Sequence, residues 1–153
     1  MALHAQNKGK EGEREIARAL NSIIRECLLA HGLPVPDRDV VQRNQNQSAV
    51  GGNDLSNCFG LSIEVKRQEQ LSINTWWQQT VKAAQANDET PVLIFRQNRK
   101  PWRVVTMVWL PLPAENGSWA STSVRAEFDW DTFLAWFKQW VDRKLQNGEL
   151  PRV

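Results

Sequence analysis

The stretch "GLSIEVKRQ", residues 60–68, decides the fold, because it has the alternating pattern of a β-strand. Side chains two residues apart on a strand share one face. Glu64 and Lys66 therefore point the same way, while Ile63 and Val65 point into a core. Taken alone, this spacing favours an ordinary solvated strand face over a reactive site.

The residues just before this strand favour the reactive site. A three-residue loop, Cys58-Phe59-Gly60, is a common hairpin connection when its glycine adopts a positive φ. Such a loop pairs Asn57 with Leu61, and continuing the ladder places Asp54 opposite Glu64. Like charges directly opposed across two strands are destabilising unless a cation lies between them. Carboxylate oxygens suit Mg²⁺ or Mn²⁺, so the pair predicts a metal site.

The first helix supplies a third carboxylate. Residues 8–31 have a helical pattern with one apolar stripe, and Glu13 lies on it, three residues before Ile16 and seven before Leu20. Glu11 and Glu15 are each about 200° away around the helix, on its wet side. Glu13 is therefore predicted to point inward. A contact with the helix dipole is the alternative explanation for a buried glutamate near a helix start.

The rest of the chain predicts an α/β fold. We expect a short strand at 40–41, a hairpin of 55–57 and 61–66, a helix over 74–86, strands over 91–96 and 102–110, an irregular linker over 111–127 and a helix over 131–145. The order α-β-β-β-α-β-β-α predicts a mixed central sheet flanked by helices.

Composition sets the class of protein. A length of 153 residues suits a single domain over 1–153, and 41% hydrophobic with 24% charged residues is ordinary for a globular protein. No apolar run reaches the ~18 residues of a membrane span, and the polar start has no secretion signal. Two cysteines without CxxC spacing make a disulfide or zinc site a poor explanation. We expect a cytoplasmic protein, in the host cytoplasm if a phage encodes it.

At this point the residues resemble the PD-(D/E)XK nuclease superfamily. Asp54, nine residues, and then Glu64-Val65-Lys66 match its core motif, with Asn53 in place of the usual proline. The segment KGKEGERE, residues 8–15, resembles the start of archaeal and phage-type Holliday-junction resolvases. The similarity covers a core of about 8–110 and leaves out the Trp-rich helix at about 131–145.

The resemblance implies a restriction-endonuclease-like core and a role for each motif residue. Glu13 matches the helix glutamate, Asp54 and Glu64 match the metal-binding acids, and Lys66 matches the catalytic lysine. Mg²⁺, with Mn²⁺ as a substitute, would be held by these acids and the Val65 carbonyl, and would activate water against a phosphodiester. The partners implied are branched DNA, four-way junctions above all, and a second copy of the chain. Candidate DNA contacts are Lys8, Lys10, Arg14, Arg43, Ser48, Arg67, Arg99 and Lys100.

Two other functions stay open. A restriction-like nuclease with the same core would cut linear duplex at defined sequences. A DNA-binding protein with an inactive nuclease fold would lack one of the motif residues, and Asp54, Glu64 and Lys66 are all present. For the aromatic residues of the last helix, Trp136 and Trp140 among them, a core role is favoured over an interface.

Overall fold

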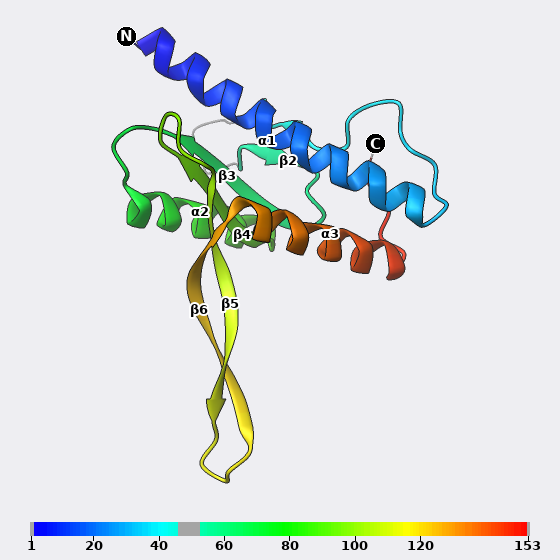
Figure 1. Cartoon of the computed structure of the whole chain (residues 1–153), viewed down its shortest axis with the longest axis vertical. Coiled ribbons are helices and arrows are strands. Elements are labelled where there is room, and N and C mark those ends of the chain that lie inside the picture. Colours follow the sequence, from blue (N-terminus) through cyan, green and yellow to red (C-terminus); the bar gives the residue numbers. More distant parts are fainter. Residues whose placement is uncertain (1, 46–52, 153) are drawn as a thin grey trace.

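The protein has a six-stranded mixed sheet with helices on both faces (Figure 1). A computed structural model describes residues 2–45 and 53–152. Strands lie in the order β1-β2-β3-β4-β5-β6, with β3 and β4 parallel and the other neighbours antiparallel. The elements are α1 (Ala2–Ala30), β1 (Gln42–Arg43), β2 (Leu55–Ser56), β3 (Leu61–Arg67), α2 (Ile73–Asn87), β4 (Thr90–Arg96), β5 (Arg103–Pro113), β6 (Trp119–Asp129) and α3 (Trp130–Gln146). The predicted α/β class is confirmed.

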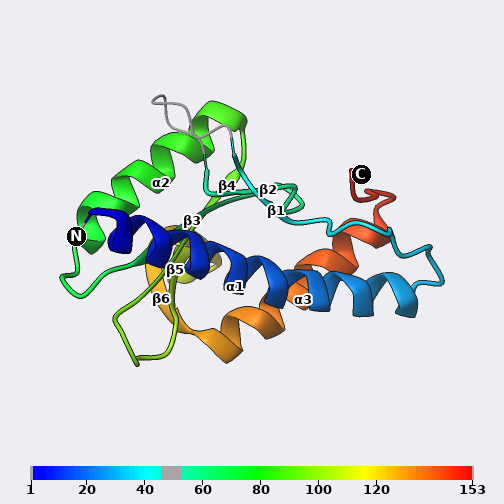
Figure 2. The ribbon, with the colours of Figure 1, turned by 90° about the horizontal axis from the view of Figure 1, so that it is seen from above.

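Helices α1 and α3 cover one face of the sheet and α2 covers the other (Figure 2). Alternation along the strands explains this, because Ile63, Val65 and Ile94 point into the larger core under α1 and α3. Leu93 and Phe95 point to the opposite face, where Trp76 of α2 packs. Strands buried on both faces need apolar residues at successive positions, as β4 has.

The predicted hairpin register is confirmed. Leu55 pairs with Ile63, as the predicted ladder requires. Asp54 lies just before this ladder, and its amide donates to the Ile63 carbonyl, so the regular pairing does not continue to Glu64. Gly60 has a φ of 86° and the Leu61 amide donates to the Cys58 carbonyl, so the loop closes as expected. Phe59 also adopts a positive φ, of 55°. The short strand expected at 40–41 lies two residues later, at β1.

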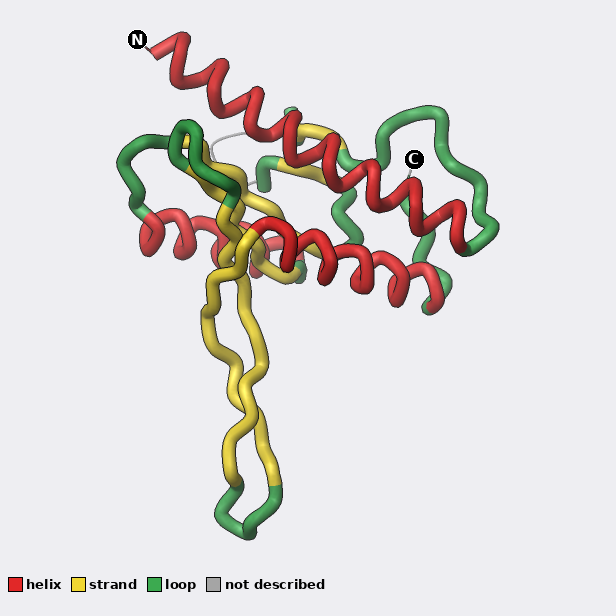
Figure 3. The backbone as a smooth tube through the Cα atoms, viewed as in Figure 1, coloured by secondary structure: helices red, strands yellow, loops and turns green. Residues whose placement is uncertain are grey.

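The irregular linker predicted for 111–127 is wrong. Strand β5 continues to Pro113 and β6 runs back from Trp119, forming a hairpin that projects from the body (Figure 3). Proline usually interrupts a strand. Here the Ala114 amide donates to the Ser118 carbonyl, so even-numbered residues of β5 form the hydrogen-bonded pairs. Pro111 and Pro113 occupy the alternate pairs, where the backbone nitrogen faces the open edge and needs no acceptor.

Helix ends differ slightly from the prediction. Helix α1 begins at Ala2, six residues before the expected start at Lys8, and its first turns extend past the sheet (Figure 1). Helices α2 and α3 each gain one residue at both ends relative to the expected 74–86 and 131–145. In the described part of the chain, none of the helices has the length and apolar character needed to cross a bilayer.

Candidate active site

Asp54 directly precedes β2 and is held beside β3. Its amide donates to the Ile63 carbonyl at 3.0 Å, and its carboxylate Oδ2 accepts the Val65 amide at 2.7 Å. The Asp54 carboxylate thus accepts a β3 amide in place of a backbone carbonyl of β2. In a strand, the N–H and C=O of one residue point to the same edge, so the Val65 carbonyl also faces this end of β2.

Glu64 of β3 lies close enough to Asp54 for its charge to act on that carboxyl, and Lys66 follows two residues later on the same face of the strand. Lys66 Nζ is 3.1 Å from Glu64 Oε1, with side chains 23% and 13% exposed. Burial, and then the charge of Glu64, raises the pKa of Asp54 to about 7. Burial also raises the pKa of Glu64, which Lys66 partly opposes. Each of the two carboxyls therefore favours the neutral form more than an exposed acid does.

Glu13 reaches the same place from α1, with an exposed fraction of 7%. Gly12 brings the helix close to β3, since a Cβ there would lie 3.2 Å from the Trp102 ring and 3.7 Å from Val65. The charge of Glu13 is felt by both other acids. The predicted helix phase is confirmed, because Glu11 is exposed and Glu15 is only half-buried.

Arg43 of β1 is the partner of Glu13. Its Nε donates to Glu13 Oε2 at 2.6 Å, and both side chains are largely buried. Across residues 2–45 and 53–152, no three or more His, Cys, Asp or Glu side chains are arranged to hold a metal ion. Glu13 is turned toward Arg43 and Glu64 toward Lys66, so cations of the protein itself occupy these carboxylates.

The donor set nevertheless fits Mg²⁺ or Mn²⁺. Burial raises the pKa of both Asp54 and Glu64, and a divalent cation beside them would supply the positive charge that stabilises their ionised forms. With the Val65 carbonyl facing the same edge, the donors are all hard oxygens, which these cations prefer. Glu13 would join them once released from Arg43.

A groove of about 730 Å³ opens over these residues. Its walls are the N-terminal half of α1 and the end of β3, and they bring together the predicted residues Lys8, Lys10, Glu13, Arg43, Asp54, Val65, Lys66 and Arg67. Several of the cations are already paired: Lys8 with Glu69 at 3.3 Å and Arg67 with Glu11 at 3.6 Å. The groove therefore combines buried acids with a basic rim.

Three predicted DNA contacts lie outside the groove. Arg14 is exposed on α1, and Arg99 and Lys100 are exposed in the turn between β4 and β5. That turn is near the basic rim, because Glu69 accepts both the Asn98 amide at 2.8 Å and Lys8. Ser48 lies outside the described residues.

Gln68 is a groove residue that the motif did not single out. It continues the alternation of Glu64 and Lys66 by one further step, and its amide donates to the Arg96 carbonyl at 3.2 Å. The period of two along β3 was the signal that could have placed it beside the catalytic candidates. The contact between Arg43 and Glu13 could not be predicted in this way, because the two residues are 30 positions apart in the sequence.

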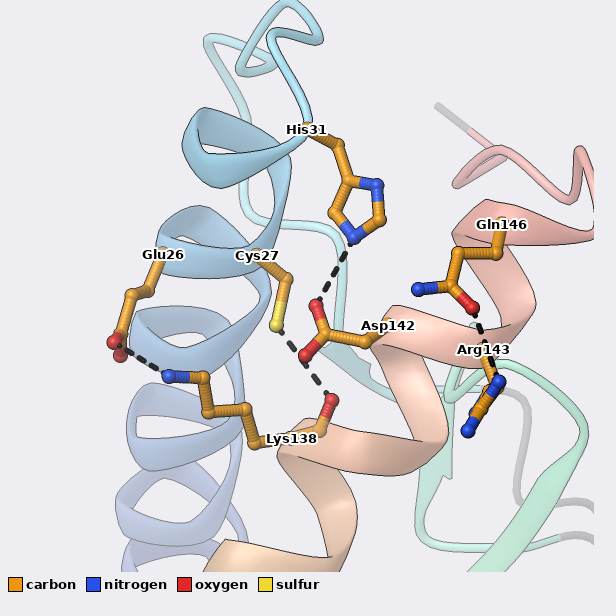
Figure 4. Close-up of polar contacts among 7 residues, drawn as sticks. All are labelled: Glu26, Cys27, His31, Lys138, Asp142, Arg143 and Gln146. Carbon is orange, nitrogen blue, oxygen red and sulfur yellow. Dashed lines mark hydrogen bonds and ion pairs between the residues drawn. The ribbon is translucent and has the colours of Figure 1, made fainter.

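A second polar cluster joins the C-terminal ends of α1 and α3 (Figure 4). His31 Nε2 lies 3.2 Å from Asp142 Oδ1, and Cys27 Sγ donates to the Lys138 carbonyl at 3.8 Å. These residue types could suggest a nucleophile, but burial raises the pKa of the Cys27 thiol to about 12, so the thiol stays protonated at neutral pH. The cluster ties two helices together. Cys58, the other free cysteine, is buried as well.

Comparison of the sequence with known proteins identifies the family of the chain. No curated protein matches the sequence. Among solved structures, the chain is similar to Archaeoglobus fulgidus Hjc, described as a Holliday junction resolvase from an archaeal hyperthermophile, with 16% identity, a TM-score of 0.37, and coverage of 82% of this chain and 87% of that one. The model of the family described as "Phage putative PDDEXK endonuclease" matches residues 4–147, nearly the whole chain. The chain therefore belongs to this family of phage PDDEXK endonucleases.

Proposed function

We propose that the protein is a metal-dependent endonuclease that acts as a homodimer on branched DNA, above all on four-way junctions. The observation that carries the proposal is the groove in which the buried acids Glu13 and Asp54 meet Lys66 under a basic rim, with Glu64 paired to Lys66 at 3.1 Å. The family match supports phosphodiester cleavage in DNA. The resemblance of residues 8–15 to the start of junction resolvases supports the branched substrate.

Each acid has a role that follows from its place. Asp54, Glu64 and the Val65 carbonyl would hold Mg²⁺ or Mn²⁺, and Glu13 would contribute to a second ion. When bound, the metal supplies Lewis-acid activation of water and neutralises charge on the phosphate. The Val65 amide keeps the Asp54 carboxylate oriented, at 2.7 Å.

Lys66 carries the positive charge nearest to the acids. Its ammonium is 3.1 Å from Glu64, where it lowers the repulsion among the carboxylates before any metal arrives. With a phosphate in the groove, the same group can position the attacking water or offset the charge that develops on the phosphate oxygens.

The basic rim would bind the DNA backbone. Lys8, Lys10 and Arg67 lie along the groove, and Arg99 and Lys100 lie beyond it on the same side. Contacts of this kind set position and affinity but do not read sequence. Selectivity for a junction would then come from two sites held at a set separation in a symmetric dimer.

One assay tests the proposal. Purified protein with Mg²⁺ is given a four-way junction, a linear duplex and a single strand, each labelled, with Asp54→Asn as the inactive control. We expect paired, symmetric nicks in the junction and little cutting of the duplex at physiological salt. Cutting of the duplex at one sequence would instead make the protein a restriction-like nuclease. Binding without any cleavage would leave only an inactive nuclease fold.

A further inference from the structure

The hairpin of β5 and β6 forms an arm that leaves the body of the protein (Figures 1 and 3). Strand β5 pairs with β4 only as far as Thr106, and from there on it pairs with β6 alone. We call residues 107–125 the arm. A two-stranded ribbon in water is marginally stable unless one of its faces is covered.

Both faces of the arm expose large apolar side chains. Trp109 and Trp119, on one face, are 72% and 75% exposed; Leu110 and Leu112, on the other, are 48% and 46% exposed. In the described part of the chain, the other exposed large apolar residues are scattered: Leu3, Leu29 and Leu150. A concentration of this kind marks an interaction surface.

The charge of the arm argues against DNA as its partner. Between Thr106 and Ala126 the only charged residues are Glu115 and Arg125, which cancel. A surface that binds phosphates needs clustered lysine and arginine, and the groove over the acids has them while the arm does not. The arm is therefore suited to an uncharged protein surface.

Such a surface lies on the same chain, beside the base of the arm. A groove of about 690 Å³ runs between α3 and the sheet, and among its described lining residues Glu89 alone is charged. Pro91, Val108, Phe133, Trp136 and Trp140 form much of its apolar wall. Trp136 and Trp140 pack against the core from one side and leave their other side to the groove.

We propose that arm and groove meet in a homodimer, in which the distal part of each arm, with Leu110 and Leu112, packs into the groove of a second copy. The contact is reciprocal about a two-fold axis, so each protomer buries one arm and one groove. Both surfaces are nearly uncharged and rich in tryptophan, as homodimer interfaces are. The inference rests on the dimer of the proposed function and names the surface that forms it.

The available area fits a dimer. Trp109, which lines the groove of its own chain, and Trp119, near the tip of the arm, together expose on the order of 300 Å² of ring surface. A stable interface needs about 800 Å² from each partner. The leucines of the arm and the wall of the groove supply the remainder, because each protomer contributes both surfaces.

The sheet order keeps this interface away from the acids. Asp54 and Glu64 lie toward the β1-β2-β3 edge, whereas the arm continues from the β5–β6 edge. A dimer joined through the arms leaves both acidic grooves open to DNA. It would also set the separation of the two sites through the length and twist of the arms.

Sedimentation of the full-length protein, without DNA or metal, tests the interface. The wild type should have twice the 17.6 kDa mass of one chain at micromolar concentration. Leu110→Asp with Leu112→Asp should return it to one chain with an unchanged circular dichroism spectrum. The matched control, Leu29→Asp with Leu150→Asp, changes two leucines that are each 61% exposed and should stay dimeric. A monomeric wild type, a dimeric arm variant or a monomeric control would overturn the proposal.

Cross-linking tests which surfaces meet. Cys27 and Cys58 are buried, so a new cysteine on the surface gives the main reaction with a short bis-maleimide. When Leu112→Cys protein is mixed with Thr132→Cys protein, one chain of each kind should be joined in the cross-linked product. Cross-linking of Leu112→Cys protein to itself would instead show that two arms contact each other, which would overturn the contact between arm and groove. If the wild type is a monomer that still nicks junctions, the proposed interface is wrong and the nuclease function stands. If the wild type is a dimer that cuts no substrate, the nuclease function is wrong and the interface stands. An arm variant that stays dimeric but loses junction binding would assign the arm to DNA.

Discussion

Asp54 and Glu64 lie close together where β2 begins beside β3, and burial together with the charge of Glu64 raises the pKa of Asp54 to about 7. Electrostatic repulsion disfavours two acids at neighbouring positions of a sheet unless another group offsets it. Their placement costs stability in the metal-free protein, which is typical of groups kept for function rather than for folding. This relationship allows folding and cleavage to be separated by experiment.

Asp54→Asn should abolish cleavage while leaving the metal-free protein at least as stable as wild type. The amide oxygen can still accept the Val65 amide, and the substitution removes a buried negative charge. We expect cleavage of a four-way junction to fall by about 100-fold or more, the scale for losing a group that stabilises transition-state charge. Melting in EDTA should show an equal or higher Tm. A clear drop in Tm would mean that Asp54 has mainly a structural role.

The raised pKa of Asp54 also links stability to pH. The folded protein keeps this proton up to about pH 7, whereas the unfolded chain releases it near pH 3.8. The folded state binds the extra proton between these values, so this contribution is complete below the lower pKa and is lost as pH rises through the higher one. In EDTA, the Tm of wild type should therefore fall relative to that of Asp54→Asn from about pH 5 to about pH 8. Parallel Tm curves for the two proteins would contradict the shift.

Local rules predicted much of this site from the sequence. Strand alternation and a three-residue loop were enough to pair Leu55 with Ile63 and to bring Asp54 near Glu64, and helix phase was enough to turn Glu13 inward. The Arg43–Glu13 contact depends on how β1 lies against α1, which no local pattern encodes. The arm was missed for a different reason: Pro111 and Pro113 break most strands, and their tolerance depends on which edge each nitrogen faces.

Glu13→Gln and Glu15→Gln should separate activity from stability. Glu13 lies among the acids, so its substitution should reduce cleavage strongly. Glu15 accepts hydrogen bonds from Arg96 at 2.9 Å and from the Trp102 indole at 3.1 Å, away from the groove. Glu15→Gln should cost ~1 kcal/mol of unfolding free energy and spare cleavage. The test is to measure the cleavage rate and the Tm of both variants. If both variants lost cleavage activity equally, Glu13 would have no special role in the active site.

Two glycines of α1 provide a matched test of how the helix is seated. Gly9 has nothing within 4 Å of a new Cβ, whereas at Gly12 the Trp102 ring would lie at 3.2 Å. Gly9→Ala should stabilise the protein by ~0.5–1 kcal/mol through helix propensity. Gly12→Ala should lose that gain to the contact with Trp102 and shift Glu13, with a lower Tm than Gly9→Ala and slower cleavage. A similar rise in Tm for both would show that α1 is not closely packed at Gly12.

The basic rim should be visible in the salt dependence of DNA binding. Lys10 lines the groove, while Lys82 is exposed on α2, which covers the opposite face of the sheet from α1. Each phosphate contact adds about 0.9 to the slope of log affinity against log salt concentration on duplex DNA. With the Asp54→Asn background preventing cleavage, Lys10→Gln should reduce that slope by about one contact and weaken binding to junction and duplex alike. Lys82→Gln should leave the slope unchanged. If the two lysines had equal effects, the backbone would not be following the groove over the acids.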